Sequence, residues 1–201
     1  LCRSSAASDV YKRQVYILDS EVVIVGGGPF GLMLAIELGR RNVTTLLYDA
    51  KNGTAYNPQA NATQARTMEY FRRLGIADEI RALGMPADYP TDIAYFTRYG
   101  HHELGRFELP ASSKANALVR SNQGSWTASE APHRISQKFV EPVLRRLAEA
   151  HDSVTINFGW RMTEFKEGAS SVSAVFEQSE TGVTHNIDAT YLIGADGARS
   201  M

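Results

Sequence analysis

Three glycines near the start of the chain have the spacing of a loop that holds phosphate groups. Gly26, Gly28 and Gly31 follow the pattern G-x-G-x-x-G. In that pattern the first glycine permits a tight turn, the second lets the backbone approach a pyrophosphate, and the third lets a helix pack closely on a strand. Asp49 lies 21 residues beyond Gly28, where a carboxylate can accept hydrogen bonds from an adenosine ribose. These residues predict a dinucleotide site, whereas a glycine turn that binds nothing would leave the spacing and the acid unexplained.

The elements that must position these residues can be read on either side of them. Residues 21–25 predict a strand, and a helix should begin directly after the turn, at Pro29 and Phe30. One face of this helix carries the residues expected to pack on the sheet: Leu32, Ala35, Ile36 and Gly39. Its N-terminus would present N–H groups and a partial positive charge to the phosphates. A second strand over residues 43–48 ends at Asp49, which completes the strand–turn–helix–strand order of a Rossmann-like α/β unit.

The remaining elements follow from hydrophobic periodicity and turn residues. Helices are predicted at residues 63–74 and 76–83 and from Ser136 onward, and residues 110–132 are predicted to form a loop or a crossover between subdomains. Strands are predicted at residues 93–97, 103–109, 154–158, 161–167, 172–178 and 185–193. In the helix after Ser136, the side chains expected to be buried are Phe139, Val140, Val143, Leu144 and Leu147. Those expected to face water are Glu141, Arg145, Arg146 and Glu149.

The first residues are set apart from the rest. Ser4–Gln14 reads as the translation of an adapter used in DNA library preparation, so we expect residues 1–14 not to be native. Without them the formal net charge changes from −1 to −3, because Arg3, Lys12 and Arg13 are lost together with Asp9. Cys2, the single cysteine, is lost as well, which leaves no disulfide or cysteine–metal site.

Composition argues against several classes of function. No apolar run approaches the roughly 18 residues that a membrane-spanning helix needs, and there is no signal-peptide pattern. No basic stripe supports nucleic-acid binding. His101 and His102 have no third ligand at a suitable spacing, so no metal is expected. We therefore expect a globular, cytoplasmic protein without membrane or nucleic-acid partners.

Four segments resemble the FAD-binding domain of flavoprotein aromatic hydroxylases, the single-component FAD-dependent monooxygenases that include phenol and chlorophenol hydroxylases. They are the glycine turn with Asp49, residues 65–75, residues 134–144 beginning Arg-Ile-Ser-Gln, and the strand ending in Gly-Ala-Asp-Gly at residues 194–197. The resemblance covers residues 20–200. It implies a Rossmann-like α/β FAD-binding domain with an inserted, smaller β-sheet subdomain, truncated at its C-terminus. Residues 15–201 would be its N-terminal part, and residues 90–130 and 160–190 would contribute to a β-rich substrate side.

The resemblance also implies roles for individual residues. Those that would hold the ADP half of FAD are Gly26, Gly28, Pro29, Phe30, Gly31 and Asp49. Gln137 matches a glutamine near the cofactor, and Asp196, followed by Gly197, matches an aspartate that serves both FAD and the nicotinamide donor. A turn aspartate that caps its own backbone is the alternative for Asp196. Arg66 would contact FAD, or else pair with Glu69 or face solvent.

Two positions depart from the family pattern. Gln59 stands where related hydroxylases often carry an arginine that contacts the flavin. Asn61 stands where phenol hydroxylases can carry an acid or a histidine that helps to deprotonate the substrate. Because an amide has no usable pKa near neutrality, either the base lies elsewhere or the substrate needs none. The catalytic residues are therefore not assigned.

The resemblance implies an enzyme that uses FAD, NAD(P)H and dioxygen to hydroxylate a small aromatic substrate, as a homodimer when full-length. Two alternatives remain open: another reaction on the same scaffold, such as epoxidation, halogenation or dehydrogenation, and a dinucleotide-binding protein without turnover. Because the chain ends at Met201, we expect these 201 residues alone to be inactive and to bind FAD weakly or not at all. The substrate, the choice between NADH and NADPH, and the oligomeric state do not follow from the sequence.

Overall fold

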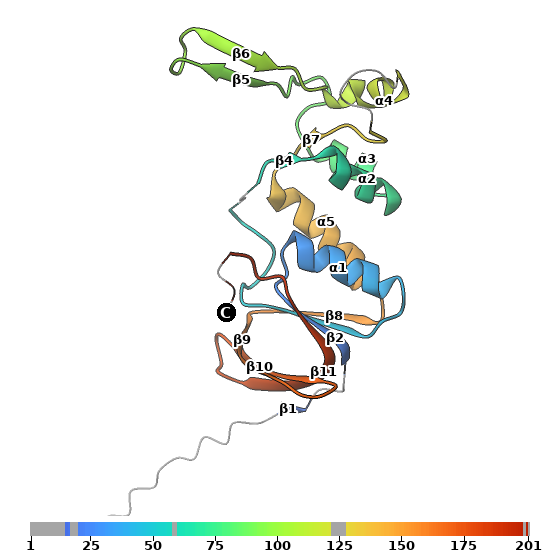
Figure 1. Cartoon of the computed structure of the whole chain (residues 1–201), viewed down its shortest axis with the longest axis vertical. Coiled ribbons are helices and arrows are strands. Elements are labelled where there is room, and N and C mark those ends of the chain that lie inside the picture. Colours follow the sequence, from blue (N-terminus) through green and yellow to red (C-terminus); the bar gives the residue numbers. More distant parts are fainter. Residues whose placement is uncertain (1–14, 17–19, 58–59, 122–127, 199, 201) are drawn as a thin grey trace, which may run out of the picture. The chain divides into compact units, whose positions relative to one another are not determined.

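The computed structural model describes residues 15–16, 20–57, 60–121, 128–198 and 200. The expectation for residues 1–14 and the departure at Gln59 lie outside these residues. The chain divides into two compact units. Figure 1 labels their helices and strands and colours them by their place in the sequence. Unit 1 comprises residues 1–54 and 144–201, and unit 2 comprises residues 55–143.

Unit 1 is built on a seven-stranded sheet with the order β8-β3-β2-β11-β10-β9, and β1 pairs with β11 beside this path. The strands are β1 (Val15–Tyr16), β2 (Ser20–Val25), β3 (Thr45–Asp49), β8 (Val154–Phe158), β9 (Trp160–Glu167), β10 (Val172–Gln178) and β11 (Thr184–Gly194). Strands β8, β3, β2 and β11 are parallel to one another, whereas β10 is antiparallel to both β11 and β9. The predicted α/β fold class is confirmed, with a sheet that is mainly parallel on one side.

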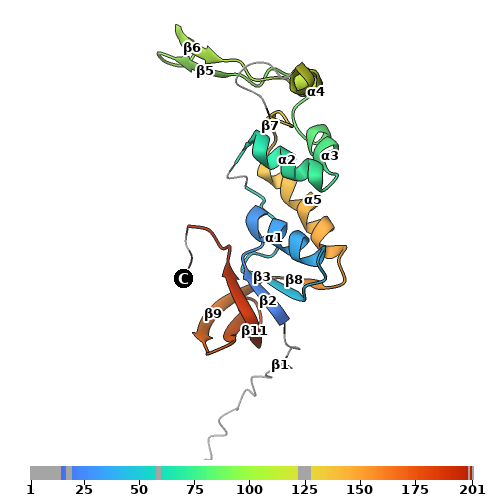
Figure 2. The same ribbon diagram turned by 45° about the vertical axis from the view of Figure 1, so that its right-hand side comes forward.

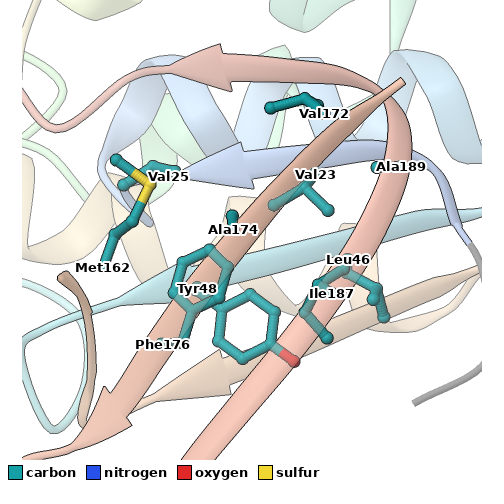
Figure 3. Close-up of a cluster of buried hydrophobic side chains, with 10 residues drawn as sticks. All are labelled: Val23, Val25, Leu46, Tyr48, Met162, Val172, Ala174, Phe176, Ile187 and Ala189. Atoms are coloured by element: carbon teal, nitrogen blue, oxygen red, sulfur yellow. The ribbon is translucent and has the colours of Figure 1, made fainter. Parts of the chain in front are cut away.

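The two faces of β2 and β3 bury different partners. Helix α1 (Pro29–Gly39) packs against β2, β3 and β8, and Figure 2 shows it lying across these strands. Its buried residues include the predicted set: Leu32, Ala35, Ile36 and Gly39. The opposite face packs against β9, β10 and β11 (Figure 3), where Tyr48 stacks on Phe176 at a centroid distance of 4.0 Å. Because both faces are covered, all five residues of β3 are buried, as expected for a central parallel strand.

Unit 2 contains helices and two short antiparallel strand pairs, of which β5–β6 is a hairpin. Its helices are α2 (Ala65–Arg73), α3 (Ala77–Ala82) and α4 (Ser112–Ser121), and α5 (Gln137–Glu149) begins in unit 2 and ends in unit 1. Strand β4 (Ala62–Thr63) pairs with β7 (His133–Arg134), and β5 (Ile93–Phe96) pairs with β6 (Glu103–Phe107). Gly75, at φ 78°, follows the end of α2, in agreement with the predicted helix stop.

Two local expectations are wrong. Residues 112–121 form α4 where a loop was predicted, because the Ala, Lys, Leu and Arg in this stretch favour a helix more than its Ser and Asn oppose one. In α5, Glu141 is buried and Phe139 is 45% exposed, the reverse of the prediction. The reason is helical spacing: Glu141 lies three and seven residues before the fully buried Leu144 and Ala148, so it shares their face.

Strands β9 and β10 belong to the main sheet of unit 1, whereas the β5–β6 hairpin belongs to unit 2. The two segments predicted for the substrate side, residues 90–130 and 160–190, are therefore parts of different units. A role of either segment in substrate binding stays a prediction.

Candidate cofactor site

Two of the three glycines in the turn are required by the fold itself. Gly26 has φ 113°, which side chains with a Cβ rarely adopt, and a Cβ there would collide with the backbone of Ala195. A Cβ on Gly31 would collide with the carbonyl oxygen of Gly26. The turn is tied to its neighbours by backbone hydrogen bonds: the Gly26 N–H donates to the Tyr48 oxygen at 2.7 Å, and the Ala195 N–H donates to the Val25 oxygen at 2.7 Å.

Gly28 is different, because a Cβ on it would meet nothing within 4 Å. Its φ of −77° suits any residue, so folding does not demand glycine here. Pro29 occupies the first helical position and the first turn carries no acidic side chain. The N–H groups of Phe30 and Gly31 lie in this first turn, where a helix supplies no acceptors of its own. Open space beside the Gly28 backbone and N–H groups at a positive helix end fit a pyrophosphate.

Asp49 joins the glycine turn to the end of β3. Its Oδ2 accepts a hydrogen bond from the Gly27 N–H at 2.6 Å, and its Oδ1 accepts one from the Lys51 N–H at 2.7 Å. The side chain is buried, and each oxygen keeps a further acceptor position for a ribose hydroxyl. Sequence reasoning missed Gly27, whose Cβ would lie 3.1 Å from the Phe158 ring. The unbroken run of three glycines at residues 26–28 was the sequence signal that could have indicated Gly27.

Asp196 and Gly197 follow β11, which pairs with β2 up to the register Gly194↔Val25. Asp196 is exposed and Gly197 has φ 84°. The carboxyl ends of β2, β3 and β11 therefore bring together eight of the ten predicted residues, which are Gly26, Gly28, Pro29, Phe30, Gly31, Asp49, Asp196 and Gly197. Ligands of parallel α/β sheets bind at this edge.

The other two predicted residues belong to unit 2. Arg66 has a side chain that is 75% exposed and donates to Glu69 at 3.1 Å, so the pairing considered as an alternative is present and FAD contact stays a prediction. The pKa of Glu69 is lowered, chiefly because the Ser129 backbone N–H donates to it. Gln137, at the start of α5, donates from Nε2 to Oε1 of the buried Glu141 at 2.6 Å. Sequence reasoning missed Glu141 because it assigned that residue to the water-facing side.

Unit 2 also contains an open cavity of about 380 Å³. Its lining is largely apolar and aromatic, including Leu83, Met85, Tyr89, Ile135 and Phe139. Its polar lining includes Asn61, Arg134 and Asp92, and Arg134 Nη1 donates to Asn61 Oδ1 at 3.3 Å. The pKa of Asp92 is lowered, first by the Leu109 N–H that donates to it and then by Arg106. A carboxylate held ionised in this way is a weak proton acceptor.

Unit 2 also contains a buried group of polar residues. Arg81 and Glu130 form an ion pair at 2.9 Å with side chains 9% and 10% exposed. Burial, followed by the charge of Arg81, lowers the pKa of His133 to about 4. His133 is therefore neutral near pH 7 and offers no positive charge to a phosphate.

Among the described residues, no His, Cys, Asp and Glu side chains group in a way that could hold a metal ion. Within the same part of the chain, none of the helices combines the length and the hydropathy that crossing a membrane requires.

Comparison with known proteins agrees with this geometry. Residues 19–201 match the family model described as FAD binding domain. The chain is 34% identical to aklavinone 12-hydroxylase DnrF of Streptomyces peucetius, over 90% of this chain and 36% of that protein. It is 30% identical to the phenol 2-monooxygenase of a Pseudomonas strain, over 92% of this chain and 30% of that protein.

Among solved structures, the flavin-dependent monooxygenase PieE in complex with FAD and substrate superposes with a TM-score of 0.78 at 28% identity, over 92% of this chain and 31% of that one. The chain thus spans about a third of the length of the relatives it matches. A family model that covers residues 19–201 includes both the glycine turn and the Gly-Ala-Asp-Gly segment. The chain therefore belongs to the FAD-binding domain family, in the branch whose relatives are FAD-dependent aromatic hydroxylases.

Proposed function

We propose that residues 15–201 are the N-terminal part of a longer FAD-dependent monooxygenase and that the glycine turn holds the ADP half of FAD. One observation carries this proposal: Gly28 has open space where a Cβ would lie, although Gly26 and Gly31 on either side are required by packing. A glycine that the fold does not need is explained by close approach of a ligand to the backbone. The Asp49 carboxylate then supplies the acceptor for a ribose hydroxyl.

In the proposed reaction one oxygen atom of dioxygen becomes a hydroxyl group on an aromatic ring, and the other is reduced to water with two electrons from NAD(P)H. When bound, FAD supplies the redox chemistry. The residues of this chain bind the cofactor and orient it: the α1 N-terminus stabilises the phosphate charge, and Asp49 fixes the turn that presents those N–H groups. Asp196, at the end of β11, is the proposed contact to the cofactor at the same edge of the sheet.

We further propose an aromatic substrate, because the relatives are named for aromatic ones, aklavinone and phenol. The cavity in unit 2 has a volume in the range of small-molecule sites, which is about 300–1,000 Å³, and an apolar, aromatic lining that suits a ring system. Asn61 and Arg134 offer an amide and a positive charge, which favour a substrate oxygen that carries negative charge. No general base is assigned to them.

The test is to express the full-length protein and record its visible absorption. We expect a flavin band that bleaches with NADH or NADPH and returns in air, faster when a phenol or a polycyclic phenol is present. Gly28→Ala should lower the flavin content of the purified protein, and Gly53→Ala should not. Gly53 is the matched control because a Cβ on it also meets nothing within 4 Å. A colourless protein that still binds NAD would refute the cofactor assignment.

A further inference from the structure

Two polar side chains lie together on the wall of the cavity in unit 2. Arg134 and Asn61 both line it, and Arg134 Nη1 donates to Asn61 Oδ1 at 3.3 Å. Because a guanidinium only donates hydrogen bonds, the Asn61 atom that faces it must be the carbonyl oxygen. The Asn61 NH₂ group is then left as a donor, and no described residue accepts from it. The pair therefore presents N–H donors to a ligand in the cavity.

The positive charge of Arg134 is not neutralised within unit 2. Among the described residues, no acidic side chain forms an ion pair with it, and the residue is half-buried. The other charged lining residue, Asp92, is already paired with Arg106 at 3.1 Å. A second cation lies beside the cavity, because Lys138 Nζ is 5.0 Å from the ring centre of the lining residue Phe139. These charges favour an anionic group beside Arg134.

The chemistry of the pair indicates which anion fits. A carboxylate accepts hydrogen bonds only and has two oxygens, which match the planar fork of Arg134 and the NH₂ group of Asn61. A carboxylate is also ionised near neutral pH without any help from the protein. A phenol such as that of tyrosine has a pKa of about 10, and the cavity offers no assigned general base to remove its proton. A carboxylate is therefore the better partner for a permanent cation.

The rest of the cavity suits the other end of such a molecule. Its apolar and aromatic lining includes Leu83, Met85 and Tyr89, and its volume is about 380 Å³. This space can bury an aromatic ring. The cavity as a whole thus fits a ligand with an apolar ring and one anionic substituent.

We propose that the substrate is an aromatic compound that carries a carboxylate, and that Arg134 is the residue that selects it. Asn61 supplies the second donor to the same carboxylate. The inference rests on the proposed function, in which this cavity receives the substrate, and it adds the chemical class of that substrate.

The test measures ligand affinity by isothermal titration calorimetry, with the full-length protein as purified and without NAD(P)H. Two pairs of probes differ only in charge: meta-hydroxybenzoate with meta-hydroxybenzamide, and a hydroxynaphthoate with the corresponding hydroxynaphthamide. In at least one pair the carboxylate should bind about 10- to 150-fold more tightly than the amide, the range expected for a hydrogen bond to a charged group.

Three variants locate the preference. Arg134→Leu removes the charge and the donors, so the carboxylate should lose most of its advantage while the amide binds much as before. Arg134→Gln removes the charge but keeps a polar side chain that can still contact Asn61, and it should also reduce the preference. Arg120→Leu is the matched control, because Arg120 is an exposed arginine of unit 2 that does not line the cavity, and it should bind both probes like the wild type.

Flavin content and ligand affinity are separate measurements, so the two proposals can fail separately. A purified full-length protein without flavin would refute the proposed function. The carboxylate proposal is wrong if the wild type binds carboxylate and amide equally well or binds neither. It is also wrong if the preference survives in Arg134→Leu, and Arg134→Gln decides this point in the same way if Arg134→Leu does not fold.

Discussion

Replacing each glycine of the turn by alanine separates the requirements of folding from those of binding. At Gly28 the added methyl meets open space. Alanine is a poorer N-cap than glycine by about 0.5–1 kcal/mol, but it also restricts the unfolded chain, which stabilises the fold by about 0.4–1 kcal/mol. The two effects nearly cancel, so the thermal midpoint of the apoprotein should change little.

The same methyl should oppose the close approach of a pyrophosphate. Overpacking of a filled site costs about 1–3 kcal/mol, which corresponds to a Kd for FAD that is raised about 5- to 150-fold. Fluorescence titration of the apoprotein with FAD measures this change. Gly53→Ala, the same substitution in equally open space, should leave the Kd unaltered.

Gly26 and Gly31 give the opposite pattern. Alanine inside a helix is better than glycine by about 1 kcal/mol, but at Gly31 its Cβ would collide with the Gly26 carbonyl oxygen. The cost of this collision should exceed the gain in helix propensity, because relieving the collision would move the turn away from α1. We expect Gly26→Ala and Gly31→Ala to unfold at a lower temperature than the wild type even without FAD. A Gly28→Ala variant that is as unstable as Gly26→Ala, or that binds FAD like the wild type, would refute the reasoning.

Three further results are expected. Because the pKa of His133 is lowered to about 4, below the value of about 6.5 in an unfolded chain, acid should destabilise the fold between pH 6.5 and pH 4 as the unfolded state takes up the proton. His133→Asn should flatten that dependence in denaturant titrations across this pH range. Arg81→Leu should lower the free energy of unfolding by about 3 kcal/mol, because it leaves the buried Glu130 with only the longer, 3.8 Å contact to the exposed Arg72, whereas Arg145→Ala in an exposed pair should cost less than about 1 kcal/mol. Asn61→Asp should raise hydroxylation rates for weakly acidic phenols relative to strongly acidic ones, because only the weakly acidic phenols need a base to lose their proton. If the ratio of the two rates is the same in the variant and in the wild type, this position is excluded as a site for a base.

The parts of the fold that the sequence predicts well are those in which one pattern dominates. The strand–turn–helix–strand unit around Gly26 combines an apolar run, a glycine spacing and an acid, and the structure places all of them at one edge of the sheet. The strands that became β8 to β11 are also close to their predicted bounds. Helix α4 was missed because its Ser and Asn residues resemble a loop when no tertiary contact is known, whereas the buried Ala115 shows that packing supports it.

The site was less predictable than the fold, because its polar contacts depend on distant parts of the chain. The 21-residue spacing indicates Asp49, but not that its carboxylate also binds the Gly27 N–H. Arg66 and Glu69 were recognisable as a helical pair from their spacing alone, and they are one. Glu141 had no such signal: a charged residue beside Pro142 on an amphipathic helix is normally exposed, and its burial depends on hydrogen bonds from Gln137 and from the backbone of Ala55, 86 positions earlier.

These contacts suggest why the glycine turn alone is a weak indicator of function. The positions that packing requires, Gly26 and Gly31, would be glycine in any protein with this strand–helix geometry, whether or not it binds a nucleotide. The positions that a ligand requires are those at which the unliganded fold is indifferent, as at Gly28. Both kinds of position become visible only when space and hydrogen bonds are known. Substitution at indifferent positions should therefore change binding without changing stability, and this difference separates a cofactor site from a structural turn.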